Sequence, residues 1–353
     1  MASGTRQASA ETDRVTAGSP YTIDPETHGR FDERNTVFAR VHWDKDASFH
    51  ETDYRGEAQA KIALGEEGYS RIEFARLLAS WTVHDCFDGA FSWKRLGRAD
   101  PAMMQLGKVD VADPAAMSEE VRKTARMFGA DLVGIARVNE RWIYSHDRSG
   151  DPVTIPSEYT HAIVMGIAMD REAVETSPSY VSGAATGVGY SRMAFAIACM
   201  AQFLRNLRYD AIPMGNDTAL SIPLAIDAGL GQLGRNGLLI TAEYGPCVRL
   251  CKVFTNLPLE ADRPSDFGLT DFCRTCTRCA DACEGEAIST SREPSFETAC
   301  PSNNAGIERW AVNADKCFDF WIRNTAACSN CIAACPFTHG AGANLGGETS
   351  QAT

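Results

Sequence analysis

Stretches dense in β-branched and other apolar residues predict several strands in the middle of the chain. The clearest are DLVGIARV (131–138) and HAIVMGIAM (161–169), which glycine or proline residues border on the flanks. DAIPMG (210–215) is a third candidate. LLIT (238–241) and VRLCKVF (248–254) are separated only by a short segment ending in the turn-forming pair Gly-Pro and a cysteine, so we expect these two to form a hairpin.

Other segments have the spacing of apolar residues that is typical of helices. One helix is expected to begin at Ser118, an N-cap residue followed by two glutamates in the positive first turn, and to end near Gly129. A long, mostly apolar helix is predicted from about Tyr190 to Tyr209, and a short one over 221–230. This mixture of strands and helices predicts an α/β or α+β body with at least one antiparallel pair of strands.

The segment 66–95 also has apolar residues at near-helical spacing, including Trp81. An aromatic cluster of Phe87, Phe91 and Trp93 follows. We interpret the segment as core packing, and the wall of a pocket is the alternative.

Length and charge narrow the function classes. The 353 residues, 44% of them hydrophobic, are enough for one large domain and a small one. The 46 acidic and 34 basic residues give a net charge of -12, which argues against a nucleic-acid partner. Residues 1–20 and 339–353 are polar and rich in small residues, which predicts a flexible arm and a disordered tail.

The sequence also bears on the compartment. It has no apolar run long enough to cross a bilayer, and its start has neither an apolar core region nor a twin-arginine pair. We therefore expect a soluble, cytoplasmic protein. The alternative is an exported protein, peripherally associated with a membrane, from which a twin-arginine leader has been removed.

Eight cysteines near the end of the chain carry the main chemical signal. The first four follow C-x2-C-x2-C-x3-C, and the last three repeat the ending, C-x2-C-x3-C-P, with one more cysteine displaced upstream. In such runs three closely spaced thiolates hold one [4Fe–4S] cluster and the fourth reaches across to the other. We assign the first cluster to Cys273, Cys276, Cys279 and Cys335. The second is assigned to Cys283, Cys317, Cys328 and Cys331.

A disulfide framework and structural zinc fit these cysteines less well than iron–sulfur clusters do. Disulfide frameworks are typical of short secreted chains, and paired zinc ligands usually lie farther apart in sequence. Cys300 also precedes a proline, but it has no C-x2-C partner upstream at the right distance, so we leave it outside the ligand set.

A glycine motif raises the question of a nucleotide site. Gly229, Gly231 and Gly234 match the G-x-G-x-x-G spacing of dinucleotide-binding loops. The motif follows a helix-like segment rather than a strand, and no acidic residue suited to a ribose stands about twenty residues on. We therefore expect these glycines to permit tight turns or a close approach of the backbone to a large ligand, which need not be a dinucleotide.

Longer motifs accompany the cysteines: GYSRM, IDAGLGQLGRNGLLIT, GPCVRLCKVFTNLPL and DKCFDFWIRN. Nearer the start stand FDERNTVFAR and GADLVGIARVNERWIYS. Together these segments resemble the catalytic subunit of reductive dehalogenases, from about residue 21 to residue 337. The resemblance implies a nitroreductase-like core over 21–260 that holds cobalamin base-off, followed by a ferredoxin-like domain over 261–338 with the two clusters.

The resemblance also implies which residues act. Tyr190 is expected to donate a proton, with Asn216 and Arg249 beside it, and Thr186 is a weaker candidate for the pocket wall. Reductive removal of halide leaves carbanion character on carbon, so a positioned acid is needed, and a guanidinium next to a phenol stabilises the phenolate. The implied mechanism is reduction of cobalt by the clusters, attack of Co(I) on the carbon–halogen bond or on the halogen, and protonation by Tyr190.

The expected partners are a small organohalide and an external electron donor, with no nucleic acid; a homodimer and a small membrane-anchor subunit are left open. The chain stops sooner after the second cluster motif than members of the family do, so residues 66–95 are a candidate to complete the substrate channel. Two alternative functions remain: an epoxyqueuosine reductase acting on tRNA, and a non-catalytic electron carrier or cobalamin-handling protein.

Overall fold

The computed structural model describes residues 20–87 and 100–340. Nearly all of the predicted arm and tail, and the aromatic residues Phe91 and Trp93, therefore lie outside the described residues. Within the described part, strands and helices are mixed as the sequence predicts, and every pairing between the strands is antiparallel.

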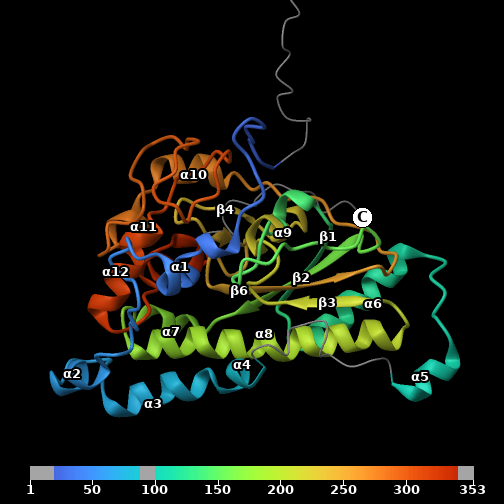
Figure 1. Ribbon diagram of the computed structural model, residues 1–353, viewed down its shortest axis with the longest axis horizontal. Helices are drawn as coiled ribbons and strands as arrows, with labels where there is room; N and C mark the ends of the chain where they lie inside the picture. The colour runs from blue at the N-terminus through green and yellow to red at the C-terminus, as the bar shows by residue number, and fades with distance from the viewer. Residues whose placement is uncertain (1–19, 88–99, 341–353) are drawn as a thin grey trace, which may run out of the picture.

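A four-stranded antiparallel sheet in the order β1-β2-β6-β3 lies at the centre of the molecule (Figure 1). Its strands are β1 (Leu132–Arg137), β2 (His161–Ala168), β3 (Ala211–Met214) and β6 (Val248–Thr255). The three strands predicted over 131–138, 161–169 and 210–215 are thus confirmed. β2 and β6 are buried along nearly their whole length, because helices or loops cover both faces of the sheet.

The predicted hairpin of 238–241 with 248–254 is wrong. The first of these segments forms β5 (Leu239–Ile240), which pairs with β4 (Gln232–Leu233) in a separate two-stranded sheet. β6 instead lies between β2 and β3. The physical reason is that β6 is buried on both faces, so it is stabilised as a central strand rather than as half of an exposed hairpin.

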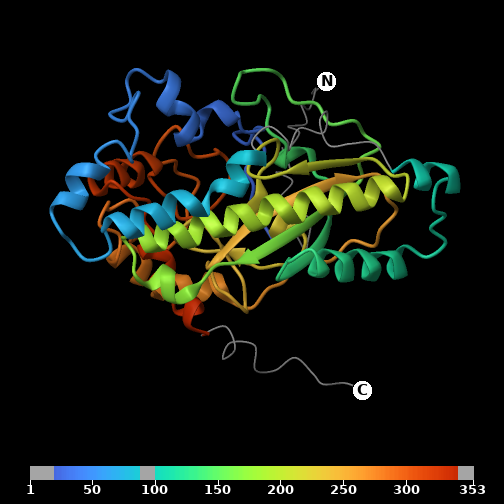
Figure 2. The same ribbon diagram turned by 90° about the horizontal axis from the view of Figure 1, so that it is seen from below.

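Helices cover both faces of the central sheet (Figures 1 and 2). α6 (Pro114–Met127) and the long α8 (Tyr180–Asn206) pack on one face, and α9 (Ser221–Asp227) with η2 (Glu140–Trp142) packs on the other. Along α8 run α3 (Arg71–Ser80) and α4 (Thr82–Phe87), and at its start lies α7 (Arg171–Glu175). The remaining helices before the sheet are η1 (Glu33–Asn35), α1 (Val37–Trp43), α2 (Ala58–Ala63) and α5 (Pro101–Leu106).

The cysteine-rich segment folds beside one end of the sheet, at the left of Figure 1. Its short helices are α10 (Leu269–Thr275), α11 (Arg278–Asp281), α12 (Ala314–Asn324), α13 (Asn330–Ala333) and η3 (Pro336–His339). α1, from near the start of the chain, contacts α12. No helix among the described residues has the length and apolar character needed to span a membrane.

Two predicted helix starts are corrected. α6 begins at Pro114, because Asp113 caps it by accepting hydrogen bonds from the backbone N–H groups of Ala115 and Ala116. Ser118 lies one turn inside the helix and donates to the carbonyl oxygen of Pro114 at 2.9 Å. Aspartate and serine are about equally good caps, so the sequence alone does not choose between them.

α8 begins at Tyr180, ten residues before the predicted start at Tyr190, after a capping box formed by Ser179 and Ser182. Glycines in its first half lower the intrinsic helix propensity and conceal this start in the sequence. Tertiary packing overrides the propensity, since these glycines allow neighbouring elements to lie against the helix. Tyr190 therefore lies in the middle of α8 rather than at its beginning.

Candidate active site

Three residues from separate elements meet at one point beside the sheet. Tyr190 lies in the middle of α8, Asn216 in the loop after β3, and Arg249 on β6. The side-chain amide of Asn216 donates a 2.7 Å hydrogen bond to the Tyr190 hydroxyl. The Arg249 guanidinium lies over the Tyr190 ring, 5.6 Å from its centroid. The three residues named from the sequence therefore lie together, with Asn216 and Arg249 both in contact with Tyr190.

Close approach of α8 to β6 positions the arginine. A Cβ at Gly189 would lie 2.8 Å from Cγ of Arg249, so no larger residue fits there without moving the arginine. Arg249 is on the α8 face of β6, and its Nε lies 3.2 Å from the sulfur of Met169. The side chain is held between helix and strand rather than free in solvent, which contradicts the usual expectation for an arginine on a strand near a turn.

A buried lysine orders the loop that carries Asn216. The Lys252 ammonium donates to the carbonyl oxygens of Gly215 at 2.7 Å and of Ala219 at 2.6 Å, on either side of the asparagine. Burial lowers the pKa of Lys252 to about 8. Several oxygen atoms of one loop accept hydrogen bonds from the buried ammonium. These bonds fix the backbone of the loop, and the side chain of Asn216 extends from that backbone to Tyr190.

Two further side chains contact the tyrosine ring from α4 and the residue before it. Trp81 stacks on Tyr190 with ring centroids 4.9 Å apart and planes inclined by 24°. His84 meets the same ring edge-on at 5.4 Å. The backbone of this region is held against α8 by Ser191, whose hydroxyl donates to the Ser80 carbonyl at 2.6 Å. The segment packs against α8, with Leu77 in a buried cluster and Phe74 and Trp81 against it, so the predicted core packing is confirmed. Trp81 also contacts the Tyr190 ring.

The eight predicted cluster cysteines form two groups in space, each around a cavity. The first cavity, of about 20 Å³, is lined by Cys273, Cys276, Cys279 and Cys335. The second, of about 330 Å³, is lined by Cys283, Cys317, Cys328 and Cys331. Cys335, the last of them in sequence, lies with the three cysteines that begin the run. These two groups are the same two sets of four that we assigned from the spacing of the cysteines in the sequence.

The thiols within each group are close enough to influence one another. Burial, and after it the nearby charge of Cys335 and other thiols of the group, raise the pKa of Cys279 to about 12. Burial, followed by Cys328 and Cys283, raises the pKa of Cys317 to about 12. No described cysteine is in a disulfide, and among the described residues no three His, Cys, Asp or Glu side chains are arranged to hold a single metal ion.

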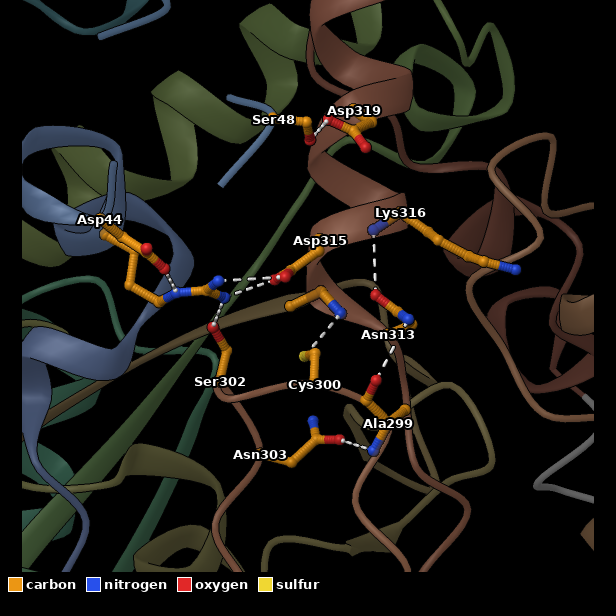
Figure 3. Close-up of polar contacts among 12 residues, drawn as sticks. Asp44, Ser48, Ala299, Cys300, Ser302, Asn303, Asn313, Asp315, Lys316 and Asp319 are labelled. Carbon is orange, nitrogen blue, oxygen red and sulfur yellow. Dashed lines mark hydrogen bonds and ion pairs between the residues drawn. The ribbon is translucent and has the colours of Figure 1, made fainter. Parts of the chain in front are cut away.

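The helix α12 brings Cys317 to the second cavity. Arg40 of α1, which is 3% exposed, donates to the Asp315 carboxylate at 2.5 Å, and Ser48 donates to Asp319 at 2.8 Å (Figure 3). These contacts tie the start and the middle of α12 to the N-terminal part of the chain. Cys317 lies between the two attachment points in sequence.

Cys300 occupies a different position. Its sulfur accepts a hydrogen bond from the backbone N–H of Ala314, the first residue of α12, at 3.3 Å (Figure 3). It does not line either of the two cysteine cavities. The cysteine that the sequence analysis left outside the ligand set therefore lies apart from both groups.

The tyrosine site and the second cysteine cavity adjoin. Thr186 and Arg249 line the cavity of about 330 Å³ together with the four cysteines. A neighbouring cavity of about 450 Å³, which Asn216 lines, shares with it Val37, Phe38 and three other residues. The two cavities therefore adjoin, and we call them together the hollow region; Arg249 lines one and Asn216 the other, and both residues contact Tyr190.

No family model matches the chain, but searches of known proteins find relatives. The tetrachloroethene reductive dehalogenase of Sulfurospirillum multivorans is 33% identical over 387 aligned positions, which cover 92% of this chain and 76% of that protein. That similarity, over most of both chains, decides the family. This chain belongs to the reductive dehalogenases. The resemblance predicted from the motifs is thereby confirmed.

Other members of the reductive dehalogenase family match over a smaller share of their length. The tetrachloroethene reductive dehalogenase of Desulfitobacterium hafniense is 40% identical over 62% of this chain and 47% of that protein. The solved structure of the catabolic reductive dehalogenase NpRdhA in complex with 3-bromo-4-hydroxybenzoic acid has the same fold, with a TM-score of 0.67 and 24% identity over 92% of this chain and 44% of that one. The chain thus spans about half the length of these two relatives.

In this reductive dehalogenase the G-x-G-x-x-G glycines face other parts of the protein. A Cβ at Gly229 would lie 2.6 Å from the carbonyl oxygen of Arg263, and one at Gly231 would lie 2.2 Å from that of Ile240. At Gly234 it would lie 2.6 Å from Cγ1 of Ile240. Close approach of the backbone accounts for all three glycines without a ligand. Their role as cofactor contacts stays a prediction.

Sequence reasoning missed His84 and identified Trp81 only as one apolar position in a helical pattern. A helix could have been predicted here, because Ser70 and Glu73 form a capping box at the start of α3 and the apolar residues that follow have helical spacing. Which of its neighbours faces Tyr190 depends on how α3 and α4 lie along α8. In this family member no local pattern carries that information.

Proposed function

We propose that this chain catalyses the reductive dehalogenation of an organohalide, with cobalamin in the hollow region and two [4Fe–4S] clusters at the cysteine cavities. The observation that carries the proposal is the contact of Asn216 and Arg249 with Tyr190 beside a cavity lined by four cysteines. The relatives named as tetrachloroethene reductive dehalogenases support it. The proposed domains are 21–260 for the catalytic core and 261–338 for the cluster domain.

The donor sets suit the clusters. Four thiols surround each cavity, and thiolates are the ligands that iron–sulfur clusters require. The burial and mutual repulsion that raise the pKa of Cys279 and of Cys317 oppose bare thiolates at these positions. Iron would remove that penalty, since it binds the thiolates and compensates their charge. We assign the ligands of each cluster as the two groups of four.

The hollow region suits the flat apolar faces of a large macrocycle, because its lining is mostly apolar. Phe38 and Val37 form a wall common to its two parts, of about 330 and 450 Å³. Thr186 and Arg249 lie where the region meets the tyrosine site. A corrinoid bound there would supply a strongly reducing metal centre for cleavage of the carbon–halogen bond, and the chain would supply position and a proton.

The chemistry of the chain's own residues follows from their contacts. The Asn216 amide donates to the Tyr190 oxygen, so the phenol keeps its own proton free to transfer to the substrate carbon. After that transfer the same amide bond and the guanidinium of Arg249 stabilise the phenolate. Trp81 covers one face of the ring and restricts its rotation. The site is therefore organised to place one acidic proton.

Anaerobic purification followed by halide-release assays with a reduced viologen tests the proposal. Aryl and alkenyl halides form the substrate panel, and Tyr190→Phe is the matched variant, since it removes only the hydroxyl. We expect halide release by the wild type and its loss in the variant. Bound corrinoid without halide release, with both proteins alike, would favour the electron carrier or cobalamin-handling alternative. Reduction of epoxyqueuosine in a tRNA stem-loop would favour the tRNA enzyme.

A homodimer, a membrane-anchor subunit, the external electron donor and the cellular compartment stay predictions.

A further inference from the structure

A buried arginine beside the first group of cysteines has no part in the proposed chemistry. Arg235 follows β4, is 1% exposed, and lines the cavity formed by Cys273, Cys276, Cys279 and Cys335. The next residue, Asn236, lines the cavities of both cysteine groups. The arginine is therefore in contact with the segment that would hold a cluster.

The hydrogen bonds of Arg235 all go to backbone carbonyl oxygens. Its guanidinium donates to Cys273, to Cys276 at 2.9 Å, to Ser289 at 2.8 Å and to Ser291 at 2.7 Å. It thus joins the end of α10 to the segment around 289–291. These bonds satisfy the donors of the side chain, but carbonyl groups are neutral and leave its charge in place.

No carboxylate in the described part of the chain compensates that charge. Throughout 20–87 and 100–340, no acidic side chain hydrogen-bonds or forms an ion pair with Arg235. The guanidinium carbon also lies 4.7 Å from the ring centroid of Trp310. Arg40, also buried, shows the usual solution, because it pairs with Asp44 and Asp315. Neutral partners offset only part of the cost of burying a cation, so a negative group at the adjoining cysteine cavity would stabilise Arg235 further.

A cluster bound by four thiolates is such a group, since it has a net negative charge that increases when it gains an electron. We propose that Arg235 is the counter-charge of the cluster at Cys273, Cys276, Cys279 and Cys335, and that it raises the reduction potential of that cluster. A fixed positive charge in a low-dielectric interior stabilises the reduced, more negative state more than the oxidised one. A weaker external donor can then reduce this cluster. The inference rests on the proposed cofactors and not on the dehalogenation reaction.

Reduction potentials of three variants test the proposal. Arg235→Gln removes the charge and keeps hydrogen-bond donors, whereas Arg235→Lys keeps the charge and loses the fork of donors. Arg205→Gln is the control, because Arg205 is also substantially buried and donates to a backbone carbonyl, that of Ala211, but lies at the far end of α8. Iron content is measured first, and then both cluster potentials are measured by a dithionite titration followed by electron paramagnetic resonance.

We expect Arg235→Gln to lower one of the two midpoint potentials and leave the other unchanged, while Arg235→Lys and Arg205→Gln stay close to the wild type. Unchanged potentials in a fully loaded Arg235→Gln protein would overturn the proposal. If Arg235→Gln loses iron, the Arg235→Lys variant decides between charge and geometry. Retention of both clusters in Arg235→Lys would support the role of the charge. Loss of a cluster in Arg235→Lys would overturn the proposal, because the fork of donors and not the charge would then be needed. Wild-type protein that binds no iron would instead refute the proposed cofactors, and missing halide release would leave this test unaffected.

Discussion

The hydrogen bond from Asn216 to Tyr190 offers the sharpest test of the active-site geometry. In Asn216→Ala the Tyr190 oxygen loses its 2.7 Å donor, and the phenolate that the proposed proton transfer would form loses one charge-assisted bond. Such a bond contributes about 1.5–3 kcal/mol, which corresponds to a fall in kcat of about 10- to 150-fold. KM should change little, because the bond strengthens in the transition state rather than on binding.

A second substitution separates charge from lost contact. In Asn216→Asp a carboxylate replaces the amide, so it repels the developing phenolate instead of stabilising it. We expect this variant to have a lower kcat than Asn216→Ala. Asn256→Ala is the matched control, since Asn256 donates to Asp210 at 2.9 Å at the opposite end of β6.

The assay is the initial rate of halide release with reduced viologen over a range of substrate concentrations, on protein with equal corrinoid and iron content. If the kcat of Asn216→Ala lies within about twofold of the wild-type value, the assigned role of the amide is refuted. An Asn216→Asp protein more active than the alanine variant would refute the electrostatic part of the reasoning. Either result would leave Tyr190 as the proton donor open to independent test.

Three further predictions concern packing, pH and ligands. In Gly187→Ala the new Cβ would meet Trp81 at 2.7 Å, so we expect a loss of about 1–3 kcal/mol of unfolding free energy and a changed tryptophan emission, measured by urea titration. Burial raises the pKa of Asp227 to about 6, so the folded state favours the protonated carboxyl and the free energy of unfolding falls as pH rises from about 4 to 6. Asp227→Asn should flatten this pH dependence. Because the shift is about two units, the variant should gain up to about 3 kcal/mol of unfolding free energy at pH 7, measured by thermal or chemical denaturation. Cys317→Ser should lose the iron of one cluster, whereas Cys300→Ser should retain the full iron content; equal iron in the two variants would contradict the ligand assignment.

Local patterns predicted what depends on neighbours in sequence. The strands over 131–138 and 161–169 were evident because a β-branched, apolar run is favoured as a buried strand wherever it lies. The spacing of Cys273 to Cys283 is similarly informative, because closely spaced thiols can converge on one cluster without distant contacts. Long motifs in the same order also sufficed to predict the family, which the comparison with the Sulfurospirillum protein confirmed.

Contacts between distant segments were decided only by the tertiary structure. The partner of β5 is β4 and not β6, because burial of both faces of β6 outweighs the short turn before it. α8 extends back to Tyr180 because its glycines are covered by Trp81 and Arg249, a stabilisation that no helix propensity contains.

The active site shows the same division. The sequence determined that a tyrosine, an amide and a guanidinium were candidates, through motifs that are short and continuous. That Asn216 donates to Tyr190, and that Trp81 and His84 close around the ring, depends on the relative placement of α8, α4 and the loop after β3. This placement minimises the free energy of the whole core, so it is not encoded in any one of these segments.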